Sequence, residues 1–114
     1  MLFRSLEELT QRVEAAVNGS VHVCPGRQKD TVGRVGVITG GAGSEVAQMA
    51  GEGINTFITG EGPHWSYPLA EELGVNVIYG GHYATETFGV KALAEWLAER
   101  TELEWCFIDH PTGL

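Results

Sequence analysis

Two segments of the chain place a histidine and a glutamate directly after an apolar run. In the first, His82 and Glu86 follow "VIYGG" and stand four residues apart. If both lie in the first turn of a helix, they share a face, and an imidazole and a carboxylate placed so can bind a divalent metal ion. The structural alternative is that Glu86 stabilises the helix N-terminus and His82 is a polar turn residue.

The second segment is "INTFITGEGPHW", in which Glu61 and His64 follow the apolar run. Glu61 has the chemistry of a general base or of a hydrogen-bond acceptor for a metal-bound histidine, and His64 that of a general acid or a ligand. A helix-start acid and a surface histidine are the alternative. If Glu61 and His64 are grouped with His82 and Glu86 as one His/Glu cluster, a functional interpretation of these residues stands beside the structural one.

Other chemistry-bearing residues give weaker signals. The turn "GGAGS" either presents backbone N–H groups to a phosphate or is a tight turn with Ser44 as a helix N-cap; it is neither G-x-G-x-x-G nor a P-loop. His22 stands beside Cys24 in a short alternating run and is interpreted as structural. His110 reaches the site only if the last strand borders it.

The elements that must position these residues alternate along the chain. Apolar runs with little alternation, typical of strands covered on both faces, come at intervals of about 20 residues and are separated by helical patterns. The sequence therefore predicts one α/β domain over 1–114, a three-layer α/β/α arrangement with a mostly parallel sheet. The predicted strands are 20–24, 34–40, 54–60, 75–79 and the segment "LEWCFID"; the predicted helices are 5–17, 44–52, 63–73 and 84–100.

Three of the predicted strands end in glycine-containing loops, "TGGAGSE", "TGEGPHW" and "YGGHYATE". Parallel α/β sheets bind ligands beyond the carboxyl ends of their strands, and glycine lets the backbone approach a ligand closely. If the strands are neighbours, these loops converge at one edge of the sheet. That convergence is the strongest functional signal that the residues give.

The composition and charge of the chain argue against several classes of function. The 114 residues carry a formal net charge of −8 with no basic patch, which argues against nucleic-acid binding and against binding an anionic membrane surface. No apolar run approaches the roughly 20 residues that span a bilayer. The start of the chain does not follow a signal-peptide pattern, so a cytoplasmic protein is expected. Cys24 and Cys106 are expected to be reduced thiols packed in strands.

The blocks "RVGVITGGAGSEV", "INTFITGEGPHW" and "VIYGGHYATETFGVKALAEWL" together resemble the Nif-three-like family of GTP cyclohydrolase 1 type 2 homologues. The resemblance covers Arg34 to Leu97 closely. It implies a site for two divalent metal ions of unknown identity, with His82 and Glu86 as ligands and with Glu61 and His64 lining the site. It also implies ring-shaped hexamers.

The chain departs from the family in length. Family members are about twice as long, and their first half supplies a His-His-Pro ligand pair and an aspartate ligand. This sequence has no His-His, and its only aspartates, Asp30 and Asp109, do not stand in the family's motif. It therefore resembles the C-terminal half alone. Three ways of completing the site stay open: Glu61 and His64 complete a site for one ion, a neighbouring subunit of a homo-oligomer (a dimer or hexamer) does so, or a partner chain carries the missing half.

Two functions follow as hypotheses. The first is a metal-dependent, hydrolase-like protein that activates water on a small, nucleotide-like substrate, with Glu61 and His64 in catalytic roles beside the metal ligands. The second is a non-catalytic binding or assembly module that keeps the fold and oligomerises without a complete metal site. A surface uncovered by the missing half favours self-association in both cases.

Overall fold

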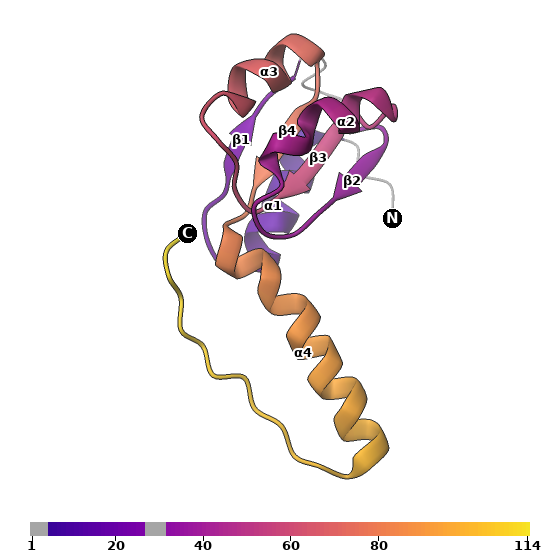
Figure 1. Ribbon diagram of the computed structural model, residues 1–114, viewed down its shortest axis with the longest axis vertical. Helices are drawn as coiled ribbons and strands as arrows, with labels where there is room; N and C mark the ends of the chain where they lie inside the picture. The colour runs from indigo at the N-terminus through magenta and orange to yellow at the C-terminus, as the bar shows by residue number, and fades with distance from the viewer. Residues whose placement is uncertain (1–4, 27–31) are drawn as a thin grey trace.

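The computed structural model describes residues 5–26 and 32–114, so the predicted polar turn "RQKDTVG" lies largely outside the described residues. Four short strands form one sheet in the order β1-β4-β3-β2 (Figure 1). The central strands β3 and β4 and the edge strand β2 run parallel, whereas β1 pairs antiparallel with β4. The mostly parallel sheet is confirmed. The strands are β1 (His22–Cys24), β2 (Val35–Val37), β3 (Thr56–Thr59) and β4 (Asn76–Tyr79).

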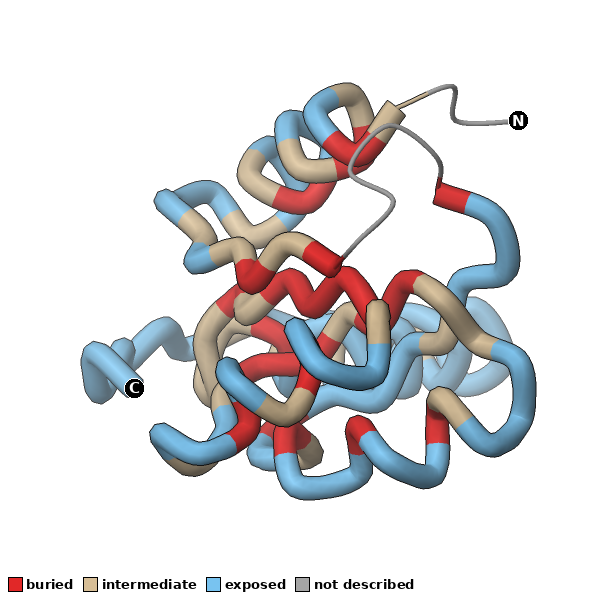
Figure 2. The backbone as a smooth tube through the Cα atoms, turned by 90° about the horizontal axis from the view of Figure 1, so that it is seen from above, coloured by how far each residue is buried: buried red, intermediate tan, exposed pale blue. Residues whose placement is uncertain are grey.

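Helices cover both faces of this sheet and complete the three layers. Helix α1 (Leu6–Val17) packs through Leu6, Leu9 and Val13 against one face. The short turn η1 (Gly43–Glu45) leads into α2 (Val46–Gly51), which packs with α3 (Ser66–Leu73) on the other face. Buried backbone is concentrated between these layers (Figure 2). The core residues on the α2 and α3 side are Cys24, Val46, Met49, Phe57, Ala70, Val75 and Val77.

The start of α1 follows the sequence prediction closely. Ser5 is the N-cap, and its hydroxyl accepts a hydrogen bond from the Glu8 N–H at 3.1 Å. The helix ends where Asn18 adopts a left-handed conformation with φ 54°. Local capping chemistry, visible in the sequence, therefore sets both ends of this helix.

Two predictions about strands are wrong: one concerns the burial of a strand and the other its existence. The run Arg34 to Gly40 was expected to be buried, but β2 lies at the sheet edge and Val37 is 63% exposed. Among the described residues, β2 pairs with β3 alone, so its other backbone edge has no strand beside it. The segment "LEWCFID" forms no strand: residues 102–110 are irregular and mostly exposed, and Cys106 is exposed rather than packed in a strand.

Helix α4 (His82–Thr101) explains why the last strand does not form. It begins at the sheet and carries the chain away from it, and the tail then runs back beside the helix (Figure 1). The tail returns to the start of α4, where the Tyr83 N–H donates to the Leu114 carbonyl at 3.0 Å. Within α4, Thr85 is the only residue that is fully buried.

No helix among the described residues combines the length and the apolar character that crossing a membrane requires.

Candidate metal-binding site at the carboxyl edge of the sheet

The carboxyl ends of β2, β3 and β4 meet at one edge of the sheet, as the glycine-rich loops predict. The Gly60 N–H and the Glu61 N–H both donate to the Gly40 carbonyl at 2.9 Å. The Gly81 N–H donates to the Gly60 carbonyl at 2.9 Å. The loops that carry Glu61 and His82 are therefore joined through backbone hydrogen bonds rather than merely adjacent.

Glycine is required at this junction because the backbones approach too closely for a side chain. A Cβ atom added to Gly60 would lie 2.4 Å from the Gly40 carbonyl oxygen and 2.7 Å from the Gly81 carbonyl oxygen. Gly40 itself has φ +76°, and a Cβ atom there would lie 2.6 Å from Glu86 Oε1. The glycines therefore both connect the strand ends and leave room for the polar side chains above them.

Three of the four predicted site residues come together above these glycines. His82 Nδ1 lies 2.7 Å from Glu61 Oε1, and His82 Nε2 lies 3.5 Å from Glu86 Oε1. His82 and Glu86 are the first and fifth residues of α4 and share a face of the helix. All three side chains are partly open to solvent, with exposed fractions of 38% for His82, 44% for Glu61 and 56% for Glu86.

Thr85 is a positioning residue that the sequence interpretation did not single out. Its hydroxyl accepts from the Gly40 N–H at 2.9 Å and lies 2.8 Å from the Gly81 carbonyl, to which it donates. Thr85 thereby fixes the start of α4 against the end of β2. The signal in the sequence was its place inside "HYATE", between the two proposed ligands.

The charge around His82 favours its protonated form. The hydrogen bond to Glu61 is the main cause that raises the pKa of His82 above its ordinary value, and the negative charge of Glu86 raises it further. Partial desolvation opposes these effects without reversing them. The same two carboxylates would attract a divalent cation in place of the proton.

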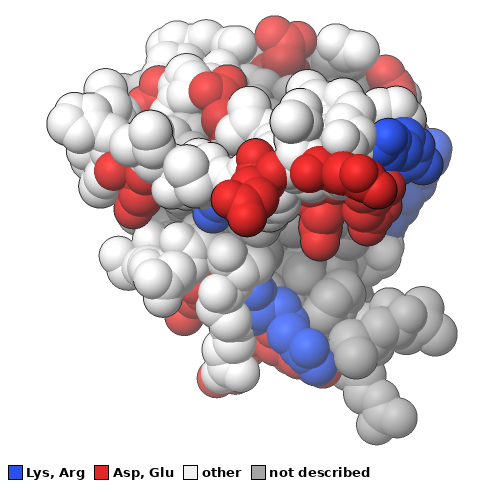
Figure 3. Space-filling view, turned by 90° about the horizontal axis from the view of Figure 1, so that it is seen from below, with Lys and Arg blue, Asp and Glu red and all other residues white. Residues whose placement is uncertain are grey.

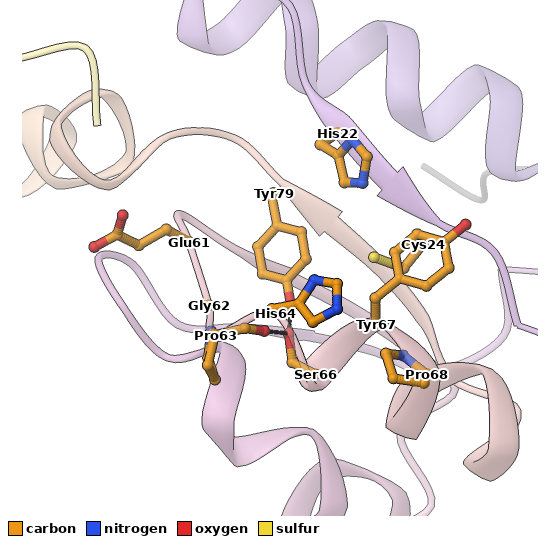
Figure 4. A pocket seen from close by; sticks show the side chains of 10 residues that line it. All are labelled: His22, Cys24, Glu61, Gly62, Pro63, His64, Ser66, Tyr67, Pro68 and Tyr79. Atoms are coloured by element: carbon orange, nitrogen blue, oxygen red, sulfur yellow. Dashed lines mark hydrogen bonds between the residues drawn. The ribbon is translucent and has the colours of Figure 1, made fainter.

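His64 is placed apart from this cluster. Among the described residues, no hydrogen bond or ion pair joins the His64 side chain to Glu61, His82 or Glu86. His64 instead lines a pocket of about 490 Å³ in which Glu61 also takes part (Figure 4). His22, which the sequence indicated as structural, lines the same pocket together with Cys24.

Two further sequence interpretations are corrected or limited here. Ser44 is not a helix N-cap: it lies within η1, and its hydroxyl donates to Glu45 Oε1 at 3.3 Å. His110 is not on a strand that borders the site. Its backbone N–H donates to the Tyr83 hydroxyl at 2.7 Å, and that hydroxyl donates to Asp109 Oδ1 at 2.9 Å.

The described residues supply an incomplete donor set for a metal ion. They contain no group of three or more His, Cys, Asp or Glu side chains arranged to hold one. Burial raises the pKa of Cys24 to about 11, so this thiol is protonated at neutral pH and offers no thiolate. On the face shown in Figure 3, acidic side chains gather in clusters and basic ones are scattered.

A mostly parallel three-layer α/β domain with a His/Glu cluster at its strand ends is the class that the fold and site define. The family model for Duf34/NIF3 (NGG1p interacting factor 3) matches residues 3–113. The chain therefore belongs to the Duf34/NIF3 family.

Individual relatives agree with this assignment. The chain is 37% identical over 109 residues to a protein of Deinococcus radiodurans named GTP cyclohydrolase 1 type 2 homolog, covering 96% of this chain and 41% of that protein. The solved structure of protein ybgI, a protein of unknown function, superposes with a TM-score of 0.86 at 37% identity, covering 95% of this chain and 44% of that one. Reduced HcgD from Methanocaldococcus jannaschii superposes with a TM-score of 0.78 at 29% identity, over 90% of this chain and 42% of that one. The chain thus spans about two fifths of the length of these relatives.

Proposed function

We propose that the protein binds a divalent metal ion through His82 Nε2 and Glu86, and that the ion serves hydrolase-like chemistry on a small, nucleotide-like substrate. The observation that carries the proposal is that the two ring nitrogens of His82 have different partners. Its Nδ1 atom is hydrogen-bonded to Glu61 at 2.7 Å, while its Nε2 atom faces Glu86 at 3.5 Å. Metal-binding histidines usually donate their second ring N–H to a carboxylate in this way.

The spacing of the two proposed ligand atoms fits a metal ion. Two ligand atoms at about 2.1 Å from a tetrahedral zinc ion are separated by about 3.4 Å. The 3.5 Å between His82 Nε2 and Glu86 Oε1 matches that separation. When bound, the ion supplies Lewis acidity and lowers the pKa of a coordinated water.

Glu61 and His64 have supporting roles in the proposed site. Glu61 orients His82, and His64 faces the pocket proposed for the substrate. Glu61 accepts from His82 Nδ1–H and so fixes the tautomer that leaves Nε2 free to coordinate. His64 lines the pocket on the other side of Glu61 and is the proposed general acid (Figure 4). The substrate class rests on the name GTP cyclohydrolase 1 type 2 homolog that relatives carry.

A non-catalytic assembly module is the second candidate function. One observation favours it: the described residues contain no group of three or more His, Cys, Asp or Glu side chains that could hold a metal ion. In this alternative, the fold assembles as a homo-oligomer or with a partner chain, and the His/Glu cluster binds no metal tightly. A partner that brings one or two further ligands would convert this module into the complete site.

Metal content separates the two functions. We expect the protein, purified without chelator, to retain about one or two divalent ions per chain by elemental analysis. The His82→Ala, Glu86→Ala variant should lose them, because it removes both proposed ligands. Zinc and manganese titrations followed by calorimetry should show the same loss.

A matched double variant controls for the removal of one histidine and one glutamate. Glu95→Ala, His110→Ala changes the same residue types away from the cluster and should keep the metal. A parent protein that folds, assembles and carries no metal would instead support the assembly module.

A further inference from the structure

The pocket beside the metal-binding cluster is walled by aromatic rings from three separate elements. His22 comes from β1, Tyr67 from α3 and Tyr79 from β4. The centre of the His22 ring lies 5.9 Å from that of Tyr67 and 6.4 Å from that of Tyr79, to which it is nearly parallel at 25°. Figure 4 shows these rings beside one another, with His64 between Tyr79 and Tyr67 in this view.

The rings are accessible rather than closed into the core. Tyr67 is 36% exposed and His22 is also exposed, so both rings present surface to a ligand. The pocket of about 490 Å³ falls within the roughly 300–1,000 Å³ that small-molecule sites occupy.

The chemistry of the lining selects for an uncharged, planar group. No lysine or arginine lines this pocket among the described residues, so it lacks the permanent positive charge that usually binds a phosphate. The hydroxyls of Ser66 and Tyr79 are hydrogen-bonded to each other, and Ser66 also donates to the Pro63 carbonyl. What remains available to a ligand is mainly ring surface, with Glu61 and His64 as polar groups at the margin.

Glu61 links the pocket to the metal-binding cluster. It lines the pocket and also accepts the hydrogen bond from His82 Nδ1. Its carboxylate points away from the rings and toward the side on which His82 is bound, so Glu61 stands between the pocket and the cluster (Figure 4).

We propose that the pocket binds a neutral, planar heteroaromatic ring of the substrate, packed against the rings of Tyr67 and His22, with Glu61 at the margin of the pocket. This inference deepens the proposed function and rests on it for the reaction. The binding itself needs no metal ion, so it can be tested separately.

The probe is 2-aminopurine riboside, whose fluorescence is quenched when the base stacks on an aromatic ring. The chelator-treated full chain should quench it saturably. Replacing a stacking ring by an aliphatic side chain removes an interaction that typically changes affinity by roughly fivefold or more. Tyr67→Leu and His22→Leu should each raise the dissociation constant by at least that factor, whereas Tyr67→Phe keeps a ring and should bind within about twofold of the parent.

Tyr83→Leu is the matched control, because it makes the same change outside the pocket lining and should leave quenching unchanged. Ribose 5-phosphate, which lacks the ring, should not displace the probe. Absence of saturable quenching in the parent would overturn the proposal, as would equal quenching by parent, Tyr67→Leu and His22→Leu. Zinc titration of the same samples separates the two claims: probe binding without zinc binding supports the pocket while removing the metal function. Zinc binding without probe binding does the reverse.

Discussion

The Glu86 side chain can occupy its position only because residue 40 is a glycine. A Cβ atom at residue 40 would lie 2.6 Å from Glu86 Oε1 and 3.3 Å from His82 Nε2. The Glu86 side chain is long and 56% exposed, so it would turn away rather than break the fold. We therefore expect Gly40→Ala to weaken zinc binding by about tenfold or more, since one of the two proposed ligands is displaced.

The backbone cost of the same change can be separated from this steric effect. Alanine at φ +76° is destabilised by about 1–2 kcal/mol in the left-handed region. Gly53 has φ +73° with no atom within 4 Å of an added Cβ, so Gly53→Ala carries the backbone cost alone. Chemical denaturation should show similar losses for both variants, and calorimetry should show weakened zinc binding only for Gly40→Ala. Equal zinc affinities would contradict the steric explanation.

His82 offers a second test at the residue scale, in metal-free protein. Because the hydrogen bond to Glu61 raises the pKa of His82, protonated His82 stabilises the folded state. That stabilisation is fully present below the ordinary histidine pKa of about 6.5 and is lost as the pH rises through the raised value. NMR titration of the His82 ring should give a midpoint above that of an unperturbed histidine.

Glu61→Gln should lower this midpoint more than Glu86→Gln does, because Glu61 is the main cause of the shift. Midpoints for His82 that do not move in Glu61→Gln would mean that the 2.7 Å contact is not made in solution.

At the scale of elements, the sequence predicted what short-range chemistry controls. The runs that became β3 and β4 are apolar without alternation, and both are the central strands of the sheet. The glycines after β2, β3 and β4 predicted the close backbone approach that brings Glu61, His82 and Glu86 together. The Ser5 cap fixed the start of α1. These features depend on neighbouring residues in the sequence, which is why they could be predicted.

The predictions that failed at the scale of elements concern features that depend on the rest of the molecule. "LEWCFID" has strand-forming residues, but a strand needs an open sheet edge within reach, and the 20-residue α4 carries the chain away from both edges. Val37 is apolar and yet 63% exposed, because sheet order rather than composition puts β2 at the edge. The aromatic pocket joins β1, α3 and β4, and no spacing within the sequence indicates that meeting.

At the scale of the whole molecule, α4 presents an apolar stripe that nothing described here covers. Val90, Leu93 and Leu97 are 57%, 58% and 43% exposed and follow Glu86 along one face of the helix. Exposed apolar stripes of this kind mark contact surfaces. Because the stripe continues the face of α4 that carries Glu86, whatever covers it also lies beside the His/Glu cluster.

Assembly and metal binding should therefore fail together when this stripe is disrupted. We expect the chain to run as a dimer or larger assembly in light scattering coupled to size exclusion. Leu93→Lys, Leu97→Lys should shift it to the monomer, because burying two lysine charges in an apolar contact is unfavourable. The same variant should retain less zinc than the parent, since the covering subunit lies next to Glu86. Glu95→Lys, which changes charge on the opposite side of α4, should alter neither property. A monomeric stripe variant with undiminished zinc would show that His82 and Glu86 hold the ion without help from a second chain.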